Sequence, residues 1–153
     1  YAKYLEGKNP FFQRNGKYID HDQRATGFDV DNAVVRWTER DLVQPEERLP
    51  IELSRGCIFK CKFCGYSLNG KKKLDYTKSA LVLKEELERN YEQFGTTDYW
   101  FSDDTFNDTV SKVEAVCDVI TKLSFKITFR AYLRLSLLFA HQHTIDMMQR
   151  AGL

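Results

Sequence analysis

Cys57, Cys61 and Cys64 lie close together in the sequence, with the spacing C-x-x-x-C-x-x-C. Cysteine thiolates bind iron and zinc, and a closed iron–sulfur site normally uses four of them. Three thiolates on one loop can hold three corners of a cubane 4Fe-4S cluster and leave the fourth iron open. The spacing therefore predicts a cluster on these three cysteines whose remaining iron is free for chemistry.

Zinc is an alternative occupant, but a structural zinc site requires a fourth donor. Cys117 has helical spacing with Val113 and Ile120, which is typical of a small buried core residue. His141 and His143 could be ligands on spacing alone, although both lie where a helix is expected to begin and favour a surface or capping role. A ferredoxin-like electron carrier would also need four cysteines for each cluster.

The stretch from residue 55 to residue 73 contains no acidic residue and these basic ones: Arg55, Lys60, Lys62, Lys71, Lys72 and Lys73. Cations beside a negatively charged thiolate cluster lower the cost of assembling and reducing it. Arg55 and Lys60 are the closer candidates, whereas the three later lysines favour a solvated loop. A non-catalytic alternative is a binding module, in which zinc or a closed cluster braces the loop and the basic run contacts RNA or a protein.

The elements that must position the cysteines alternate strand and helix from residue 50 onward, which predicts an α/β fold with a parallel sheet. Strands are expected at residues 51–54 and 99–102 and from residue 125 to residue 132. The cysteine loop leaves the carboxyl end of the first strand, where α/β folds and barrels bind their ligands. In the third strand, Lys126, Thr128, Arg130 and Tyr132 form a polar face that we expect to line the inside of a barrel.

Three helices should connect and follow these strands. Thr77 can cap the first and Gly95 can end it, with an apolar stripe of Ala80, Leu83, Leu87, Tyr91 and Phe94. The second carries Val110, Val113, Cys117, Ile120 and Leu123 on one face, and the third is expected at residues 143–152. Residues 49–153 therefore form the predicted core domain.

Residues 1–48 are expected to form a flank or cap. Asn15-Gly16 between apolar pairs predicts a tight β-hairpin, and residues 28–37 could form one more strand. Pro45 and Pro50 should bracket a turn before the core.

The composition excludes several broad classes. Lys plus Arg number 23 against 22 Asp plus Glu, so no overall charge indicates nucleic acid or an anionic membrane. No apolar run approaches the ~20 residues of a membrane span. Clustered free cysteines indicate a reducing compartment, so we expect a cytoplasmic protein. Because the chain starts at Tyr1, we also expect a fragment of a longer protein.

The run Arg55-Gly-Cys-Ile-Phe-Lys-Cys-Lys-Phe-Cys-Gly65 resembles the signature loop of the radical S-adenosylmethionine enzymes, including the aromatic residue before the last cysteine. The resemblance implies a 4Fe-4S cluster on the three cysteines, with S-adenosylmethionine chelating the free iron through its amino and carboxylate groups. An electron donor would then drive reductive cleavage to a 5'-deoxyadenosyl radical, which abstracts hydrogen from a small-molecule or macromolecular substrate. Phe63 and Gly65 would contribute to the cofactor site, with Phe63 near the adenine.

The resemblance covers about residues 49–152, the first three βα units of that family's partial (β/α) barrel. The segments Leu-Ser-Arg-Gly-Cys and Phe-Ser-Asp-Asp-Thr-Phe are similar to those of family members that have an upstream cobalamin-binding domain. These residues contain no such domain, so cobalamin is expected only through a domain outside this chain.

In that family the loop after the second strand often holds the amino group of S-adenosylmethionine, usually through a glycine-rich acidic motif. Here Ser102-Asp103-Asp104-Thr105 occupies this place without the glycines, and we expect Asp103 or Asp104, not both, to take that role. Capping by Asp108 and turn formation by Asp104 are the alternative. Arg134 lies nearest the carboxyl end of the third strand and could bind a carboxylate through a two-pronged hydrogen bond.

Overall fold

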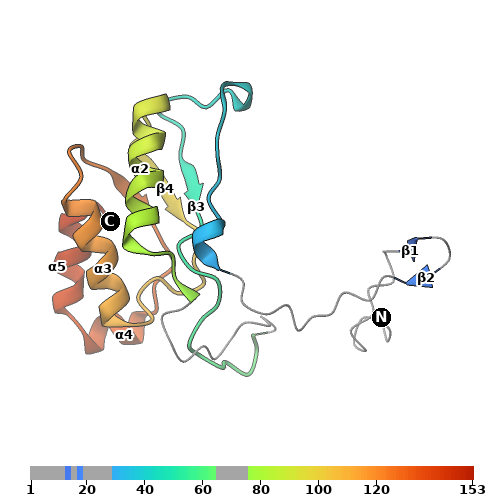
Figure 1. The fold of residues 1–153 in the computed structure, drawn as a ribbon. Helices are drawn as coiled ribbons and strands as arrows, with labels where there is room; N and C mark the ends of the chain where they lie inside the picture. The colour runs from blue at the N-terminus through green and yellow to red at the C-terminus, as the bar shows by residue number, and fades with distance from the viewer. Residues whose placement is uncertain (1–12, 15–16, 19–28, 65–75) are drawn as a thin grey trace.

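The computed structural model describes residues 13–14, 17–18, 29–64 and 76–153 (Figure 1). Gly65 and Lys71 to Lys73, which the sequence singles out, lie outside the described residues. Strands β1 (Gln13–Arg14) and β2 (Lys17–Tyr18) pair antiparallel, with Gln13 opposite Tyr18. This pairing confirms the hairpin that the Asn-Gly dipeptide predicts.

The core contains a three-stranded parallel sheet in the order β3 (Leu49–Ile51), β4 (Asp98–Phe101) and β5 (Thr128–Arg130). Its parallel strands, joined through helices, confirm the predicted α/β class. The sheet is open: within the described residues its strands do not close into a barrel. The expected polar face of the third strand is therefore exposed at Thr128 and Arg130 and does not line an enclosed lumen.

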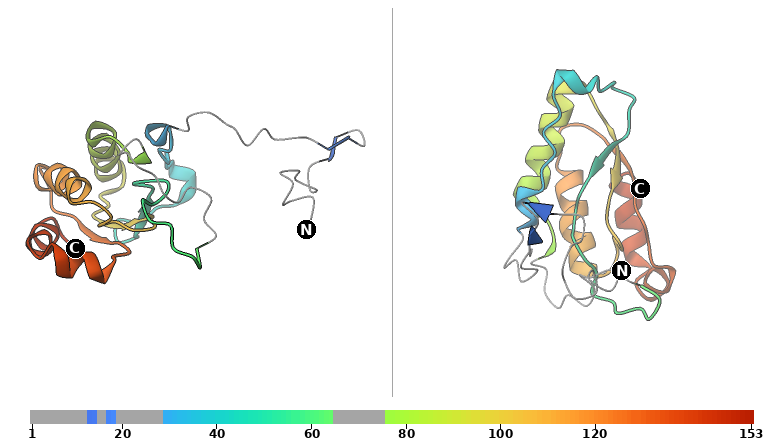
Figure 2. Two further views of the ribbon diagram at one scale, coloured as in Figure 1. Left: turned by 90° about the horizontal axis from the view of Figure 1, so that it is seen from below. Right: turned by 90° about the vertical axis from the view of Figure 1, so that its right-hand side faces the viewer.

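Helices α2 (Ala80–Phe94), α3 (Val110–Thr121) and α5 (His143–Arg150) lie side by side on one face of the sheet (Figures 1 and 2). The strand residues that point toward these helices are fully buried, namely Leu49, Ile51, Tyr99, Phe101 and Phe129. Phe101 and Phe129 stack with their ring centroids 4.8 Å apart. The aromatic and aliphatic core thus lies between the sheet and one helical layer.

The helix ends follow local capping rules. Ser79 caps α2, because its Oγ accepts a hydrogen bond from the Val82 N–H, and Gly95 ends the helix with a left-handed φ of 69°. Thr109 caps α3 by accepting from the Lys112 N–H at 3.2 Å. Gly95 was predicted correctly as the end of α2. The suggested N-caps differ from the observed ones: Thr77 lies two residues before Ser79, and Asp108 lies one residue before Thr109.

The predicted apolar stripe of α2 is only partly correct. Leu83 and Leu87 are buried, but Ala80 and Tyr91 are exposed, and the buried face instead includes Glu86 and Asn90. Glu86 is buried because Lys78, itself buried, forms an ion pair with it at 2.5 Å. A paired carboxylate can occupy a core position that periodicity assigns to an apolar side chain.

Residues 29–37 contain no strand, contrary to prediction. Val30–Asn32 form a 3-10 helix, η1, since the Asp29 carboxylate accepts from the Asp31 N–H and closes a local turn. A second 3-10 helix, η2, spans Glu39–Asp41.

Two further details of the core differ from the sequence expectation. Pro50 was expected to flank a turn but lies inside β3, which a proline can do because β3 is at the edge of the sheet. The chain after β5 forms two helices, since the short α4 (Leu135–Ala140) precedes α5.

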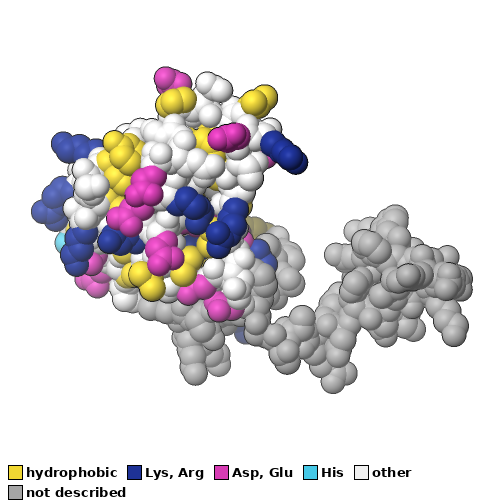
Figure 3. Space-filling model, turned by 45° about the horizontal axis from the view of Figure 1, so that its top comes forward, with side chains coloured by type: hydrophobic (Ala, Val, Ile, Leu, Met, Phe, Trp, Pro, Cys, Tyr) yellow, Lys and Arg dark blue, Asp and Glu magenta, His cyan; other side chains and the backbone are white. Residues whose placement is uncertain are grey.

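On the face drawn in Figure 3, basic and acidic side chains are interspersed, in keeping with the nearly balanced charge of the chain. Within the described residues, every helix is too short or too polar to traverse a lipid bilayer.

Candidate functional site

A hollow of about 410 Å³ lies where the chain leaves the carboxyl ends of the three parallel strands. The loop after β3, the loop after β4 and the segment after β5 all contribute to its lining: Cys57, Phe59, Cys61, Phe63, Cys64, Asp104, Thr105, Leu133 and Arg134. The structure therefore brings all three predicted cysteines together with Phe63, Asp104 and Arg134. Among the predicted site residues that are described, Asp103 does not line the hollow.

The three cysteines differ in how firmly they are held. Cys57 is buried, with 7% of its surface exposed, whereas Cys61 is half-buried and Cys64 is exposed. The Cys57 Sγ lies 3.6 Å from the Thr105 Oγ1 and accepts a hydrogen bond from the Phe59 N–H at 3.5 Å. Phe63, which lies between Cys61 and Cys64 in the sequence, is 93% exposed.

Backbone contacts fix the chain before Cys57. The Arg55 N–H donates to the Tyr76 carbonyl at 2.9 Å, and the Lys78 N–H donates to the Leu53 carbonyl at 2.8 Å. Gly56 has a φ of 116°, a conformation that L side chains rarely adopt, and this residue redirects the chain into the cysteine loop. Cys57 therefore follows a segment that is held by the backbone around Tyr76 and Lys78, while Cys61 and Cys64 lie on a more exposed arm.

Arg134 is positioned by its backbone and stacks on an aromatic ring. Asn107 bonds both polar groups of the Arg134 backbone: its Oδ1 accepts from the N–H at 2.8 Å and its Nδ2 donates to the carbonyl at 3.1 Å. The guanidinium lies 4.1 Å from the centre of the Phe59 ring, with one nitrogen 3.9 Å from the Cys61 Sγ. Its Nε also donates to the Ser136 Oγ at 3.2 Å. Stacking and this hydrogen bond orient the guanidinium, which presents further N–H donors suited to an anion.

The two candidate aspartates have different environments. Asp103 is buried, forms an ion pair with the Lys112 Nζ at 2.6 Å and accepts from the Thr105 N–H at 3.2 Å. Asp104 lines the hollow, and its pKa is raised by desolvation and by the charge of Asp103, against an opposing effect of Lys112. Asp104 is therefore the carboxylate that a bound cation could reach.

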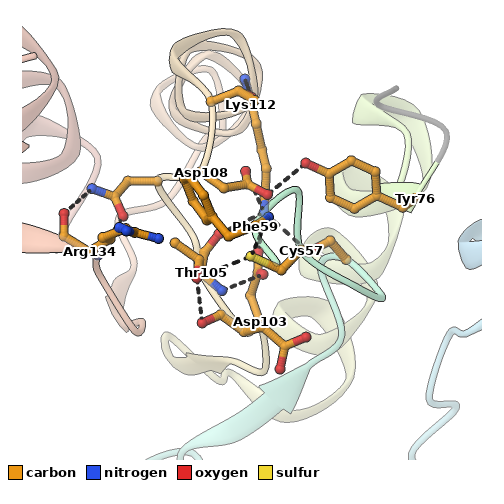
Figure 4. Close-up of polar contacts among 12 residues, drawn as sticks. Cys57, Phe59, Tyr76, Asp103, Thr105, Asp108, Lys112 and Arg134 are labelled. Atoms are coloured by element: carbon orange, nitrogen blue, oxygen red, sulfur yellow. Dashed lines mark hydrogen bonds and ion pairs between the residues drawn. The ribbon is translucent and has the colours of Figure 1, made fainter. Parts of the chain in front are cut away.

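Lys112 is a residue that the sequence reasoning missed. It is 2% exposed and lies at the centre of the buried polar contacts drawn in Figure 4. Beside it the Tyr76 O–H donates to Asp108 at 2.6 Å. The pKa of the phenol is raised, mainly by burial and secondly by this hydrogen bond. Lys112 follows Asp108 by four residues and precedes Val116 by four, so its helical spacing could have indicated a paired lysine on the buried face.

The remaining candidates lie outside the lining of the hollow. Cys117 is buried in the core, as predicted, and desolvation raises the pKa of its thiol to about 11. His143 begins α5 and His141 ends α4, with their rings in edge contact at 6.2 Å. Arg55 forms a two-pronged ion pair with Glu52 at 2.6 and 2.7 Å, so a carboxylate already balances its charge.

The lining of the hollow fits an iron–sulfur cluster by its donor set. In the described part of the chain, no three His, Cys, Asp or Glu side chains are grouped to hold a single metal ion. A cubane makes a different demand, because each cysteine binds a different iron and the sulfurs need not crowd around one centre as they do around zinc. The three thiols that line the hollow match the number of cysteine donors that the predicted cluster takes.

No protein-family model, curated protein or solved structure matches the chain. The interpretation of the hollow therefore depends on its own chemistry, which combines three thiols, one carboxylate, one guanidinium and two phenylalanine rings.

Proposed function

We propose that this chain is part of a radical S-adenosylmethionine enzyme, with Cys57, Cys61 and Cys64 as the ligands of a 4Fe-4S cluster. The observation that carries the proposal is that all three cysteines line one hollow at the carboxyl ends of the parallel strands, together with Asp104 and Arg134. In this proposal the open sheet and its helices correspond to the first three βα units of a partial barrel. When bound, the cluster would supply the electron that cleaves S-adenosylmethionine to a 5'-deoxyadenosyl radical.

The side chains around the hollow are suited to a ligand that carries both charges and an aromatic ring. The Asp104 carboxylate would attract the ammonium and sulfonium groups, and the Arg134 guanidinium would take the carboxylate. The exposed ring of Phe63 provides an apolar surface for the adenine. Leu133 and Thr105 also line the hollow.

Anaerobic reconstitution with iron and sulfide tests the proposal. We expect a 4Fe-4S absorbance band and a paramagnetic signal on reduction that changes shape when S-adenosylmethionine is added. Cys57→Ala, Cys61→Ala or Cys64→Ala should each abolish the cluster. Cys117→Ala is the matched control and should retain it, because Cys117 belongs to the core. An equal loss with Cys117→Ala would instead indicate a site with four cysteine ligands.

A binding module is the second candidate, favoured by the exposed arm on which Lys60, Lys62 and Phe63 all face solvent. Exposed basic and aromatic side chains are the groups that contact single-stranded RNA. Elemental analysis and an RNA-binding assay separate the two functions. Stoichiometric zinc without iron would favour the module, and so would RNA binding that weakens steeply with salt.

A further inference from the structure

Lys112 connects the two loops that meet at Cys57. Its Nζ lies 2.6 Å from an Asp103 carboxylate oxygen, 3.1 Å from the Ser54 Oγ, 3.1 Å from the Thr105 carbonyl and 3.2 Å from Asp108 (Figure 4). The side chain is 1% exposed, and those of Asp103 and Asp108 are fully buried. One ammonium thus satisfies acceptors from the loop after β3 and from the loop after β4.

These contacts reach Cys57 by two short routes. Ser54 precedes Cys57 by three residues on the segment that backbone hydrogen bonds hold against Tyr76 and Lys78. Thr105, whose carbonyl accepts from Lys112, places its own Oγ1 3.6 Å from the Cys57 Sγ. The position of the one buried cysteine of the hollow therefore depends on where Lys112 holds its neighbours.

The same contacts determine the local charge. One lysine and two aspartates carry a formal net charge of −1, and the Tyr76 phenol adds none because burial raises its pKa. Charges in a buried network are screened weakly by solvent and salt, so a change at any of these groups is felt at the adjoining hollow. Each electron that enters a thiolate cluster adds a further negative charge, which nearby carboxylates oppose and nearby cations favour.

We propose that Lys112 is a positioning residue of the cluster site, which fixes Ser54 and Thr105 around Cys57 and offsets the charge of the buried Asp103 and Asp108 carboxylates. This inference rests on the proposed function. Its consequence is that the charge of the network, and not only its shape, sets the reduction potential for the single electron taken from a low-potential donor.

The test measures the reduction potential of the reconstituted cluster in four variants, without S-adenosylmethionine. Lys112→Met leaves two unbalanced carboxylates and should lower the potential by about 59 mV, a tenfold change in a one-electron equilibrium. Asp103→Asn removes one negative charge and should raise the potential by a similar amount. Lys112→Met combined with Asp103→Asn restores the net charge and should return close to wild type, as should Lys112→Arg.

Lys122→Met is the matched control, since Lys122 caps the C-terminal end of α3, is exposed and forms an ion pair with Asp118 at 2.7 Å. It should leave the potential unchanged, because water screens its charge. Equal potentials in Lys112→Met, Asp103→Asn and wild type would overturn the inference, and so would shifts of the same sign. If Lys112→Met does not fold, the upward shift in Asp103→Asn decides alone. Wild-type protein that assembles no cluster would overturn the proposed function itself.

Discussion

At the scale of single residues, the four cysteines occupy four different environments. Cys64 is exposed and Cys61 is half-buried, and both line the hollow. Of the two buried cysteines, Cys57 also lines the hollow and Cys117 does not. Reactivity toward an alkylating reagent requires both access and the thiolate form. The cysteines of the cluster-free protein should therefore react in sequence.

Mass spectrometry after alkylation at pH 8 should show Cys64 and Cys61 modified first, Cys57 more slowly, and Cys117 slowest of all. At pH 8 a thiol with a pKa of about 11 is ionised in roughly one molecule in a thousand, so labelling of Cys117 should accelerate as the pH rises. Reconstitution with iron and sulfide should protect the first three cysteines. Modification of Cys117 as fast as Cys64 at pH 8 would show that α3 is not packed as described.

Residue types, spacing and the family resemblance singled out candidate site residues that line one hollow: Cys57, Cys61, Cys64, Phe63, Asp104 and Arg134. Lys112 and Asn107 were missed. Lys112 has one partner nearby in the sequence, Asp108, but the other partners are distant: Ser54 for Lys112 and the Arg134 backbone for Asn107. A periodicity rule counts a lysine or an asparagine as solvent-facing unless a buried partner is known. Such partners become visible only when the tertiary arrangement brings loops together.

At the scale of secondary structure, two glycines with positive φ have different reasons to be glycine. Gly95 has a φ of 69°, and an added Cβ would make only ordinary contact with Pro45, at 3.8 Å. Gly152 has a φ of 105°, and a Cβ there would overlap the carbonyl oxygen of Ile127. The first position is limited by backbone conformation alone and the second also by space.

Gly95→Ala should lower the free energy of unfolding by about 1 kcal/mol, the usual cost of placing a Cβ in the left-handed region. Gly152→Ala should cost several times more, because the end of α5 must move away from the strand it contacts: the Phe129 N–H donates to the Gly152 carbonyl at 3.0 Å. Urea denaturation of both variants measures the difference. Equal losses would contradict the close approach at Gly152.

The order of most strands and helices was predictable because α2, β4, α3, β5 and α5 carry their own periodicity and turn signals. The failures have physical causes that local patterns do not contain. Residues 29–37 read as a strand but are bent by the Asp29 side chain, and α4 is a six-residue helix without a side-chain cap. The register that joins Leu49 to Tyr99 and Tyr99 to Phe129 becomes clear only from the assembled sheet.

At the scale of the whole molecule, the described residues form a helical layer on one face of the sheet. The candidate site is formed by segments that follow three different strands. A ligand that binds across such segments in the folded state only must stabilise that state. Cluster loading and global stability should therefore be linked.

Reconstituted protein should unfold at a higher temperature than cluster-free protein. Binding at 100 times the dissociation constant adds about 2.7 kcal/mol, or roughly 5–10 °C for a domain of this size. Differential scanning calorimetry under anaerobic conditions measures the shift, and chelation of iron should reverse it. The variant that carries Cys57→Ala, Cys61→Ala and Cys64→Ala together should show no shift after the same treatment; a shift in that variant would place the stabilising metal elsewhere.

Pro50 has a consequence for how this sheet can grow. The Ile51 carbonyl accepts from the Ser102 N–H of the neighbouring segment, so the alternation of a strand directs the nitrogen of Pro50 to the opposite, outer side. A proline nitrogen donates no hydrogen bond, so a further strand that pairs with the outer edge of β3 would lack the backbone hydrogen bond at residue 50. Additional strands, from this chain or from a neighbouring molecule, should therefore join beside β5, and accidental edge-to-edge association through β3 is disfavoured.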